Sequence, residues 1–173
     1  MWDFFETVRH RHSIRKYQPD MPVEIEKLHA ILEMACAAPS AGDLQAYRII
    51  VVRDPIERQA LVHVAHEQIF IAEAPVCLVF CADPARSETA FGERGAKLYA
   101  LQDATIAAAY AQLAIVAAGM GSTWVGYFEE ERVRDALGLE PGLIPIALMS
   151  LGYPAELPEP SARRRLHEVV VWR

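Results

Sequence analysis

Arginine residues gather near the two ends of the chain, in segments 11–17 and 163–165. In the first segment Arg11, Ser13 and Arg15 alternate, so in an extended stretch their side chains leave from one face. Two guanidinium forks and a hydroxyl on one face fit a phosphate group. The alternative is that chain ends are solvated and tolerate charge. Because termini lie close together in many domains, we expect both segments to serve one anion site.

The loop 39–45 is the second candidate binding segment, with the sequence Pro-Ser-Ala-Gly-Asp-Leu-Gln. It follows a predicted helix and precedes a predicted strand. Small residues and short polar side chains let a flat heteroaromatic ligand approach the backbone closely. The segment therefore predicts a ligand-binding loop.

Other patterns predict no site. The segment 119–124, Gly-Met-Gly-Ser-Thr-Trp, resembles a dinucleotide fingerprint, but it follows a helix and has Trp in place of the third Gly. His63, His66 and Glu67 can share a helix face as metal ligands, but a solvated helix face is the favoured interpretation, and we predict no metal. No serine lies in a GxSxG motif.

Composition sets the class of protein. The 173 residues are the length of one domain, and 53% of them are hydrophobic, which excludes a disordered chain. Seventeen basic and 23 acidic residues give a net charge of −6, which disfavours binding to nucleic acid. Cys36, Cys77 and Cys81 form no CxxC pair, and the last two are expected in the core. The most apolar stretch, 104–120, predicts a buried helix and no membrane span, so we expect a soluble, cytoplasmic protein.

Hydrophobic periodicity and turn residues predict the elements that position these segments. Helices and strands mix without βαβ alternation, which indicates an α+β fold. A polar loop is expected over 83–95. Helices are predicted over 3–9, 24–37, 56–65, 96–118 and 129–137, and strands over 47–52, 76–82, 124–128, 144–151 and 169–172.

The last predicted strand, 169–172, follows a Pro-rich stretch over 154–160. An extended arm of this kind can carry a strand to the sheet of a partner subunit. The alternative is that the strand folds back on its own sheet. The alanine-rich helix 96–118 allows close helix packing, as in a dimer interface.

Together these segments resemble the FMN-dependent nitroreductase family in its short, single-domain form. The resemblance covers essentially the whole chain, 1–173, with the motifs in order. The matching segments are Arg11 to Tyr17, Ala38 to Gln45, Gly92 to Gly95 with Tyr99 to Asp103, Trp124 to Phe128, Leu151 to Glu156, and Arg163 to Trp172.

The resemblance implies a mixed or antiparallel sheet flanked by helices, in a domain-swapped homodimer with two FMN sites at the subunit interface. It assigns residues to each part of the FMN site. The assigned residues are Arg11, His12, Ser13, Arg15, Arg163 and Arg164 at the phosphate and ribityl end, Pro39, Ser40, Ala41, Gly42, Asp43 and Gln45 from the other subunit, and Val125, Gly126 and Tyr127 at the flavin N5.

The resemblance also implies an activity: a hydride passes from NAD(P)H to FMN, and electrons then pass to a nitroaromatic, a quinone or a similar acceptor by a ping-pong mechanism. The flavin does the chemistry, so no catalytic side chain is assigned. The alternatives are a flavin-binding module without turnover, or an enone reductase, dehalogenase or flavin-degrading enzyme of the same fold. Two departures concern the site: Asp43, where the family has Asn, can only accept hydrogen bonds when ionised, and Ala109-Tyr110 replaces Gln-Asn.

Overall fold

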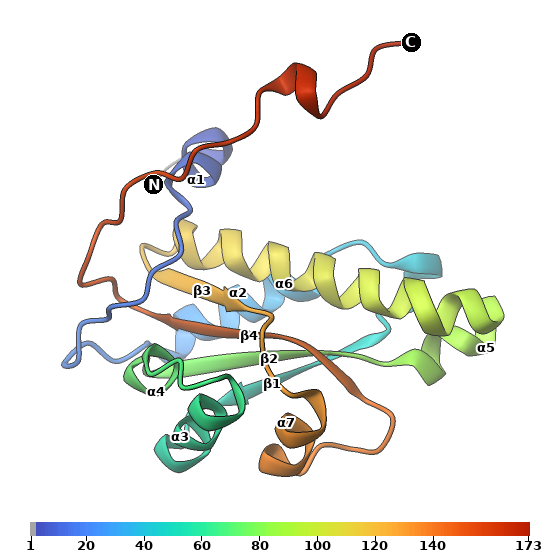
Figure 1. Ribbon diagram of the computed structural model, residues 1–173, viewed down its shortest axis with the longest axis horizontal. Coiled ribbons are helices and arrows are strands. Elements are labelled where there is room, and N and C mark those ends of the chain that lie inside the picture. The colour runs from blue at the N-terminus through green and yellow to red at the C-terminus, as the bar shows by residue number, and fades with distance from the viewer. Residues whose placement is uncertain (1–2) are drawn as a thin grey trace.

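The computed structural model describes residues 3–173, and a four-stranded antiparallel sheet forms its centre (Figure 1). The strand order is β1-β2-β4-β3, which confirms the predicted α+β class. Every residue of β2 is buried, as its unbroken apolar sequence predicts for a central strand. The strands are β1 (Tyr47–Val52), β2 (Val76–Ala82), β3 (Gly121–Val125) and β4 (Ile144–Gly152).

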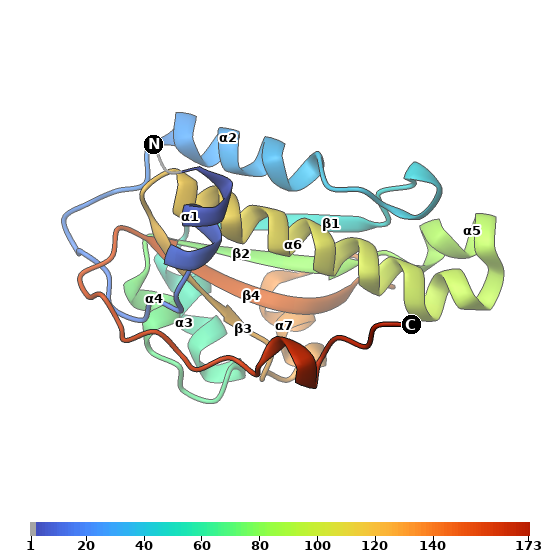
Figure 2. The same ribbon diagram turned by 90° about the horizontal axis from the view of Figure 1, so that it is seen from above.

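Helices cover both faces of the sheet (Figures 1 and 2). One core cluster packs α2 and α6 against one face, and a second packs α3, α4 and α7 against the other. The helices are α1 (Phe4–His10), α2 (Ile25–Cys36), α3 (Pro55–Val64), α4 (Phe70–Glu73), α5 (Pro84–Arg94), α6 (Ala100–Ala117) and α7 (Glu130–Leu137), with a π-helical turn over Gly95–Tyr99.

The apolar helix predicted over 96–118 is a core helix. Alanines on one side of α6, such as Ala104, Ala107 and Ala111, are fully buried against the sheet and α2. The continuous helical stretch Pro84–Ala117 is long and apolar enough to cross a membrane by length and composition alone. Within this stretch, the alanine-rich side of α6 is buried against the sheet, as in the core helix of a globular protein.

Two of the elements predicted before the C-terminal arm need correction. The predicted polar loop 83–95 is wrong, because α5 forms there: the Asp83 side chain caps the Arg86 N–H, and Pro84 occupies the first turn. The strand predicted over 124–128 lies three residues earlier, as β3. Its register is set by pairing with β4, where Gly121 lies opposite Gly152.

The C-terminal arm, residues 153–173, leaves the sheet and runs away from its layers (Figure 1). A 3₁₀ turn, Leu166–Glu168, replaces part of the expected extended run, and no strand forms over 169–172 in the single chain. The alternative of a strand folded back on its own sheet is therefore wrong for this conformation. Apolar side chains of the arm are left exposed, among them Leu157 at 91% and Trp172 at 85%.

Cys77 and Cys81 lie in β2 and are fully buried, as predicted. Burial raises the pKa of each thiol to about 12, because the interior disfavours the charged thiolate. Neither side chain is therefore a nucleophile at neutral pH.

Candidate functional site

The segment 11–17 is extended and attached to β3. Ser13 and Ser122 form a parallel bridge, and the Ile14 N–H donates to the Ser122 carbonyl at 3.0 Å. The Thr123 hydroxyl donates to the Ile14 carbonyl. A side chain at Gly121 would meet Ile14 Cγ1 at 2.4 Å, so this close approach requires glycine. Ile14 is buried, whereas Arg11, Ser13 and Arg15 remain accessible, as the alternation predicts.

Tyr17 fixes the other end of this segment. Its hydroxyl donates to the Ile14 carbonyl at 2.7 Å and lies 2.8 Å from the Ser150 hydroxyl in β4. Burial raises the pKa of Tyr17, so the phenol stays protonated and able to donate. The segment is therefore held between β3 and β4.

The base of the C-terminal arm lies beside the same segment. Tyr17 and Pro154 form an antiparallel bridge, the Ala155 N–H donates to the Lys16 carbonyl at 2.9 Å, and the Glu156 carboxylate accepts from the Arg15 N–H at 3.1 Å. This ladder directs the arm along the arginine-bearing segment.

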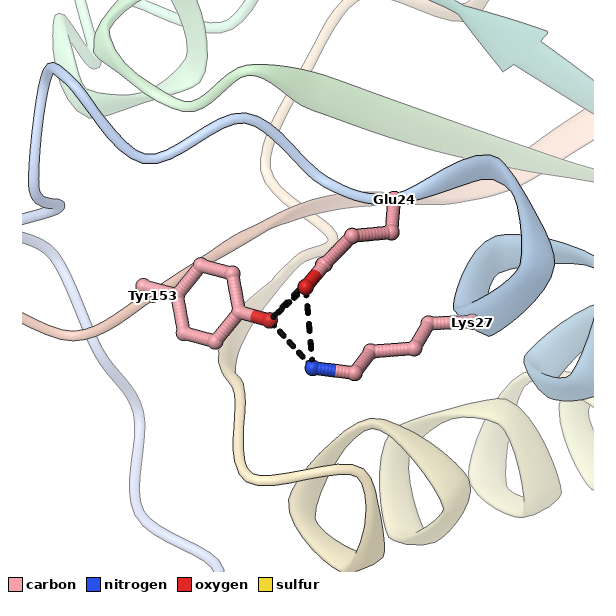
Figure 3. Close-up of polar contacts among 3 residues, drawn as sticks. All are labelled: Glu24, Lys27 and Tyr153. Atoms are coloured by element: carbon pink, nitrogen blue, oxygen red, sulfur yellow. Dashed lines mark hydrogen bonds and ion pairs between the residues drawn. The ribbon is translucent and has the colours of Figure 1, made fainter.

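A polar cluster attaches the start of the arm to α2 (Figure 3). The Tyr153 hydroxyl donates to the Glu24 carboxylate at 2.7 Å, and Lys27 Nζ lies 3.1 Å from the same carboxylate. The hydrogen bond from Tyr153 lowers the pKa of Glu24, and the bond to Tyr153 raises the pKa of Lys27. Glu24 is exposed and Lys27 and Tyr153 are half-buried, so we assign the cluster a positioning role for the arm.

Arg11 and Arg163, from opposite ends of the sequence, lie close enough for their charges to interact. The pKa of Arg11 is lowered, mainly because its guanidinium is partly buried and to a smaller extent because Arg163 carries the same charge nearby. Neither guanidinium has a carboxylate partner within residues 3–173. Two like charges near each other, neither paired with a carboxylate, fit a multiply charged anion such as a phosphate. The donor set is therefore suited to the phosphate of FMN.

The other residues predicted at the phosphate end lie nearby or elsewhere on the arm. The Arg15 guanidinium is exposed and lies 5.8 Å from the centre of the Phe70 ring. His12 is half-buried. The Arg164 guanidinium donates to the Glu168 carbonyl at 2.6 Å within the arm's own turn.

The end of β3 presents the segment predicted at the flavin ring. Val125 is buried, whereas Gly126 and Tyr127 are exposed, and Gly126 lines a cavity of about 570 Å³. Gly126 follows Ser122, the partner of Ser13, by four residues, which is about 13 Å along a strand. That spacing suits a mononucleotide laid along β3 with its phosphate at the arginines and its ring at Gly126.

His63, His66 and Glu67 do not converge on one point. His63 Nδ1 lies 2.9 Å from the Glu67 carboxylate. The His66 ring instead stacks on Tyr127, with centroids 3.8 Å apart. Each imidazole thus has its own protein contact.

The loop 39–45 is tightly folded. Gly42, Asp43 and Gln45 all have positive φ, at 56°, 55° and 48°, and such left-handed backbone at non-glycine residues is a strained feature found at binding sites. The Ser40 hydroxyl accepts from the Gln45 N–H at 2.9 Å, and the Gln45 amide donates to the Asp43 carboxylate at 2.8 Å. A cavity of about 590 Å³ lies beside the loop, and its lining includes Pro39, Ser40, Ala41 and Tyr99.

Asp103 of α6 anchors this loop, a role that the sequence analysis missed. Its buried carboxylate accepts from the Ala41 N–H at 2.9 Å and from the Ala46 N–H at 3.2 Å. A lone acidic residue within an apolar helix was the available signal, because a buried carboxylate needs such partners.

We expect Asp103→Asn to destabilise the protein by about 1.5–3 kcal/mol, because an amide nitrogen cannot accept and one backbone N–H loses its charged partner. Urea unfolding measures this loss, with Asp20→Asn at an exposed position as the control. Equal midpoints for the two variants would contradict the anchoring role.

The two predicted binding segments lie far apart in the single chain. Segment 11–17 is at one end of the sheet and the loop 39–45 is at the other, in both views (Figures 1 and 2). One chain therefore does not bring them to one ligand.

Comparison with known proteins identifies relatives along most of the chain. The model of the nitroreductase family matches residues 8–72 and 55–153. A protein named NADH dehydrogenase from Thermus thermophilus is 40% identical over 190 residues, covering 94% of this chain and 92% of the relative. The NADPH-flavin oxidoreductase of Vibrio harveyi is 31% identical, covering 95% of this chain and 71% of that protein.

Solved structures share the fold. The NADPH:FMN oxidoreductase of Vibrio harveyi, solved with NAD⁺, superposes with a TM-score of 0.89 at 30% identity, covering 97% of this chain and 76% of that one. A structure from Exiguobacterium sibiricum, solved with FMN, has a TM-score of 0.90 at 22% identity, covering 100% of this chain and 98% of that one. The second likeness concerns the fold alone.

Proposed function

Because this chain belongs to the nitroreductase family, we propose that it is an FMN-dependent oxidoreductase that takes a hydride from NAD(P)H and passes electrons to a small electron-poor molecule. The observation that carries the proposal is the segment 11–15, which is bridged to β3 and leaves Arg11, Ser13 and Arg15 accessible. Arg163 lies near enough for its charge to act on Arg11. Relatives named as flavin oxidoreductases and FMN reductases support the same cofactor and reductant. Quinones and nitroaromatics are the proposed acceptors.

The chain's own residues bind and orient the cofactor, whereas bound FMN supplies the hydride chemistry. Arg11, Ser13, Arg15 and Arg163 would hold the phosphate, with His12 and Arg164 beside them. The exposed Gly126, between Val125 and Tyr127, would offer its backbone N–H to the flavin ring. No side chain is assigned an acid, base or nucleophile role.

The site is completed by a second copy of the chain. We assign the loop 39–45 to the partner's flavin, since in one chain it lies at the opposite end of the sheet from the arginines (Figure 2). The exposed apolar side chains of the arm, such as Leu166, Val171 and Trp172, support a domain-swapped homodimer, because isolated apolar side chains on an arm gain burial from a partner. We also propose a cytoplasmic location, where reduced nicotinamide is available.

The purified protein is expected to be yellow and to release FMN, and not FAD, on denaturation. Anaerobic NAD(P)H alone should bleach the flavin, and initial rates with both substrates varied should give parallel double-reciprocal lines, because donor and acceptor share one flavin face. Colourless protein that does not bind added FMN would refute the proposal. Flavin that binds but is not reduced would indicate a binding module, and intersecting lines would exclude the shared face.

A further inference from the structure

Helix α5 and the π-helical turn that follows it cover the loop 39–45. The Arg86 guanidinium donates to the Leu44 carbonyl. A side chain at Gly42 would meet the Phe91 ring at 2.9 Å, which places that ring directly against the loop. Under the proposed function this loop borders the flavin, so α5 borders the space through which a substrate reaches it.

Three cations lie on this helix and turn, and two of them are already engaged. Arg86 donates to Leu44, as above, and Lys97 pairs with the Glu93 carboxylate. Arg94 has no carboxylate partner among residues 3–173. It is the cation of this group that remains available to an anionic ligand.

Arg94 is nevertheless held in place. Its Nε donates to the Tyr99 hydroxyl at 3.0 Å, and its guanidinium carbon lies 5.5 Å from the centre of the Tyr99 ring. Holding the guanidinium through Nε and the ring leaves both terminal nitrogens free to donate, in the fork that suits a phosphate. Tyr99 positions the cation without neutralising it.

Tyr99 also lines the cavity of about 590 Å³ that includes Pro39, Ser40 and Ala41. The one carboxylate in that lining, Asp103, already accepts two backbone N–H groups. The lining therefore contains no unpaired acid, and one of its residues, Tyr99, carries Arg94 on its hydroxyl and ring.

Resting on the proposed function, we infer that Arg94 binds the phosphate groups of the dinucleotide reductant. The nicotinamide must reach the flavin ring, while the diphosphate of NAD(P)H extends outward and needs a cation close to the loop 39–45. A quinone acceptor carries no such charge. Arg94 would therefore strengthen binding of the reductant NAD(P)H and leave binding of a quinone acceptor at the same flavin face unchanged.

The test compares Arg94→Ala with wild-type protein by rapid anaerobic flavin reduction. The apparent Kd for NADH and NADPH should rise about 10-fold or more, because a charge-assisted contact is lost. The rate with 1-benzyl-1,4-dihydronicotinamide, a donor without phosphate, should not change. Arg94→Lys should recover part of the affinity, and Arg132→Ala on α7 is the matched surface control.

The results distinguish failure of the proposed oxidoreductase function from failure of the proposed role of Arg94. A wild-type flavin that neither NAD(P)H nor the phosphate-free donor reduces refutes the proposed function. A wild-type flavin that both donors reduce, with unchanged NAD(P)H affinity in Arg94→Ala, refutes the role of Arg94 alone. An equal loss with both donors also refutes it, because the defect would then lie in the flavin site.

Discussion

A chain that ends after Pro160 is expected to lose both its bound FMN and its partner subunit. The deletion removes Arg163, one of the two paired guanidinium groups, and the exposed apolar side chains Leu166 and Trp172. Loss of the phosphate contact and of the partner's loop 39–45 together should weaken FMN binding about 100-fold or more.

The truncated chain should nevertheless remain folded. Within residues 3–173, the hydrogen bonds of segment 161–173 stay inside that segment, such as the Val170 N–H to the Leu166 carbonyl at 2.9 Å. The four strands and both core clusters lie outside it. Circular dichroism should therefore be unchanged while light scattering reports a monomer.

Full-length Arg163→Ala provides the matched control for the truncation. It removes the same guanidinium but keeps the apolar arm, so it should remain a dimer with weakened FMN binding. A truncated monomer that keeps its flavin would contradict both the two-chain site and the role of the arm.

Local signals explain why most of the sheet was predictable from sequence. The strand bounds 47–52 and 76–82 agree with β1 and β2, because apolar runs end at Asp-Pro pairs in both cases. Gly138 at φ 56° ends α7 as a left-handed cap, which the sequence also indicates. These signals lie within a few residues of the element they define.

The wrongly predicted elements are those whose bounds depend on contacts with residues far away in the sequence. Helix α5 is polar, and its packing against the loop through Phe91 and Arg86 is not visible in its own periodicity. The start of β3 depends on pairing with β4, about thirty residues later. The C-terminal segment has strand-forming residues, but it leaves the sheet after β4 and pairs with neither edge strand, β1 or β3.

In the candidate site, too, some residues were predictable from local sequence and others depend on long-range packing. The alternation of Arg11, Ser13 and Arg15 predicts their common accessibility, and clustering of charge predicts the approach of Arg163. Asp103 lies 62 residues from Ala41, so its hydrogen bond to the loop depends on the packing of α6. A hydrogen bond between residues so far apart in the sequence is only weakly indicated by the residues around either of them.

Neutralising Arg11 or Arg163 should have opposite effects on cofactor binding and on the stability of the FMN-free protein. Each of Arg11→Ala and Arg163→Ala is expected to weaken FMN binding by about 1.5–3 kcal/mol, roughly 10- to 150-fold, through loss of a charge-assisted contact. The FMN-free protein should become more stable, most of all in Arg11→Ala, because that change removes a partly buried charge as well as its repulsion by Arg163. The lowered pKa of Arg11, caused by burial and then by Arg163, indicates that the fold disfavours this charge without an anion.

Titration with FMN and thermal unfolding of the FMN-free protein measure the two effects separately. Arg132→Ala is the control, since Arg132 pairs with Glu129 on the far helix α7 and should change neither quantity. The double variant Arg11→Ala/Arg163→Ala should gain less stability than the sum of the single variants, because either substitution alone removes the repulsion. Reduced stability together with unchanged FMN affinity would mean that the two arginines support the fold and bind no phosphate.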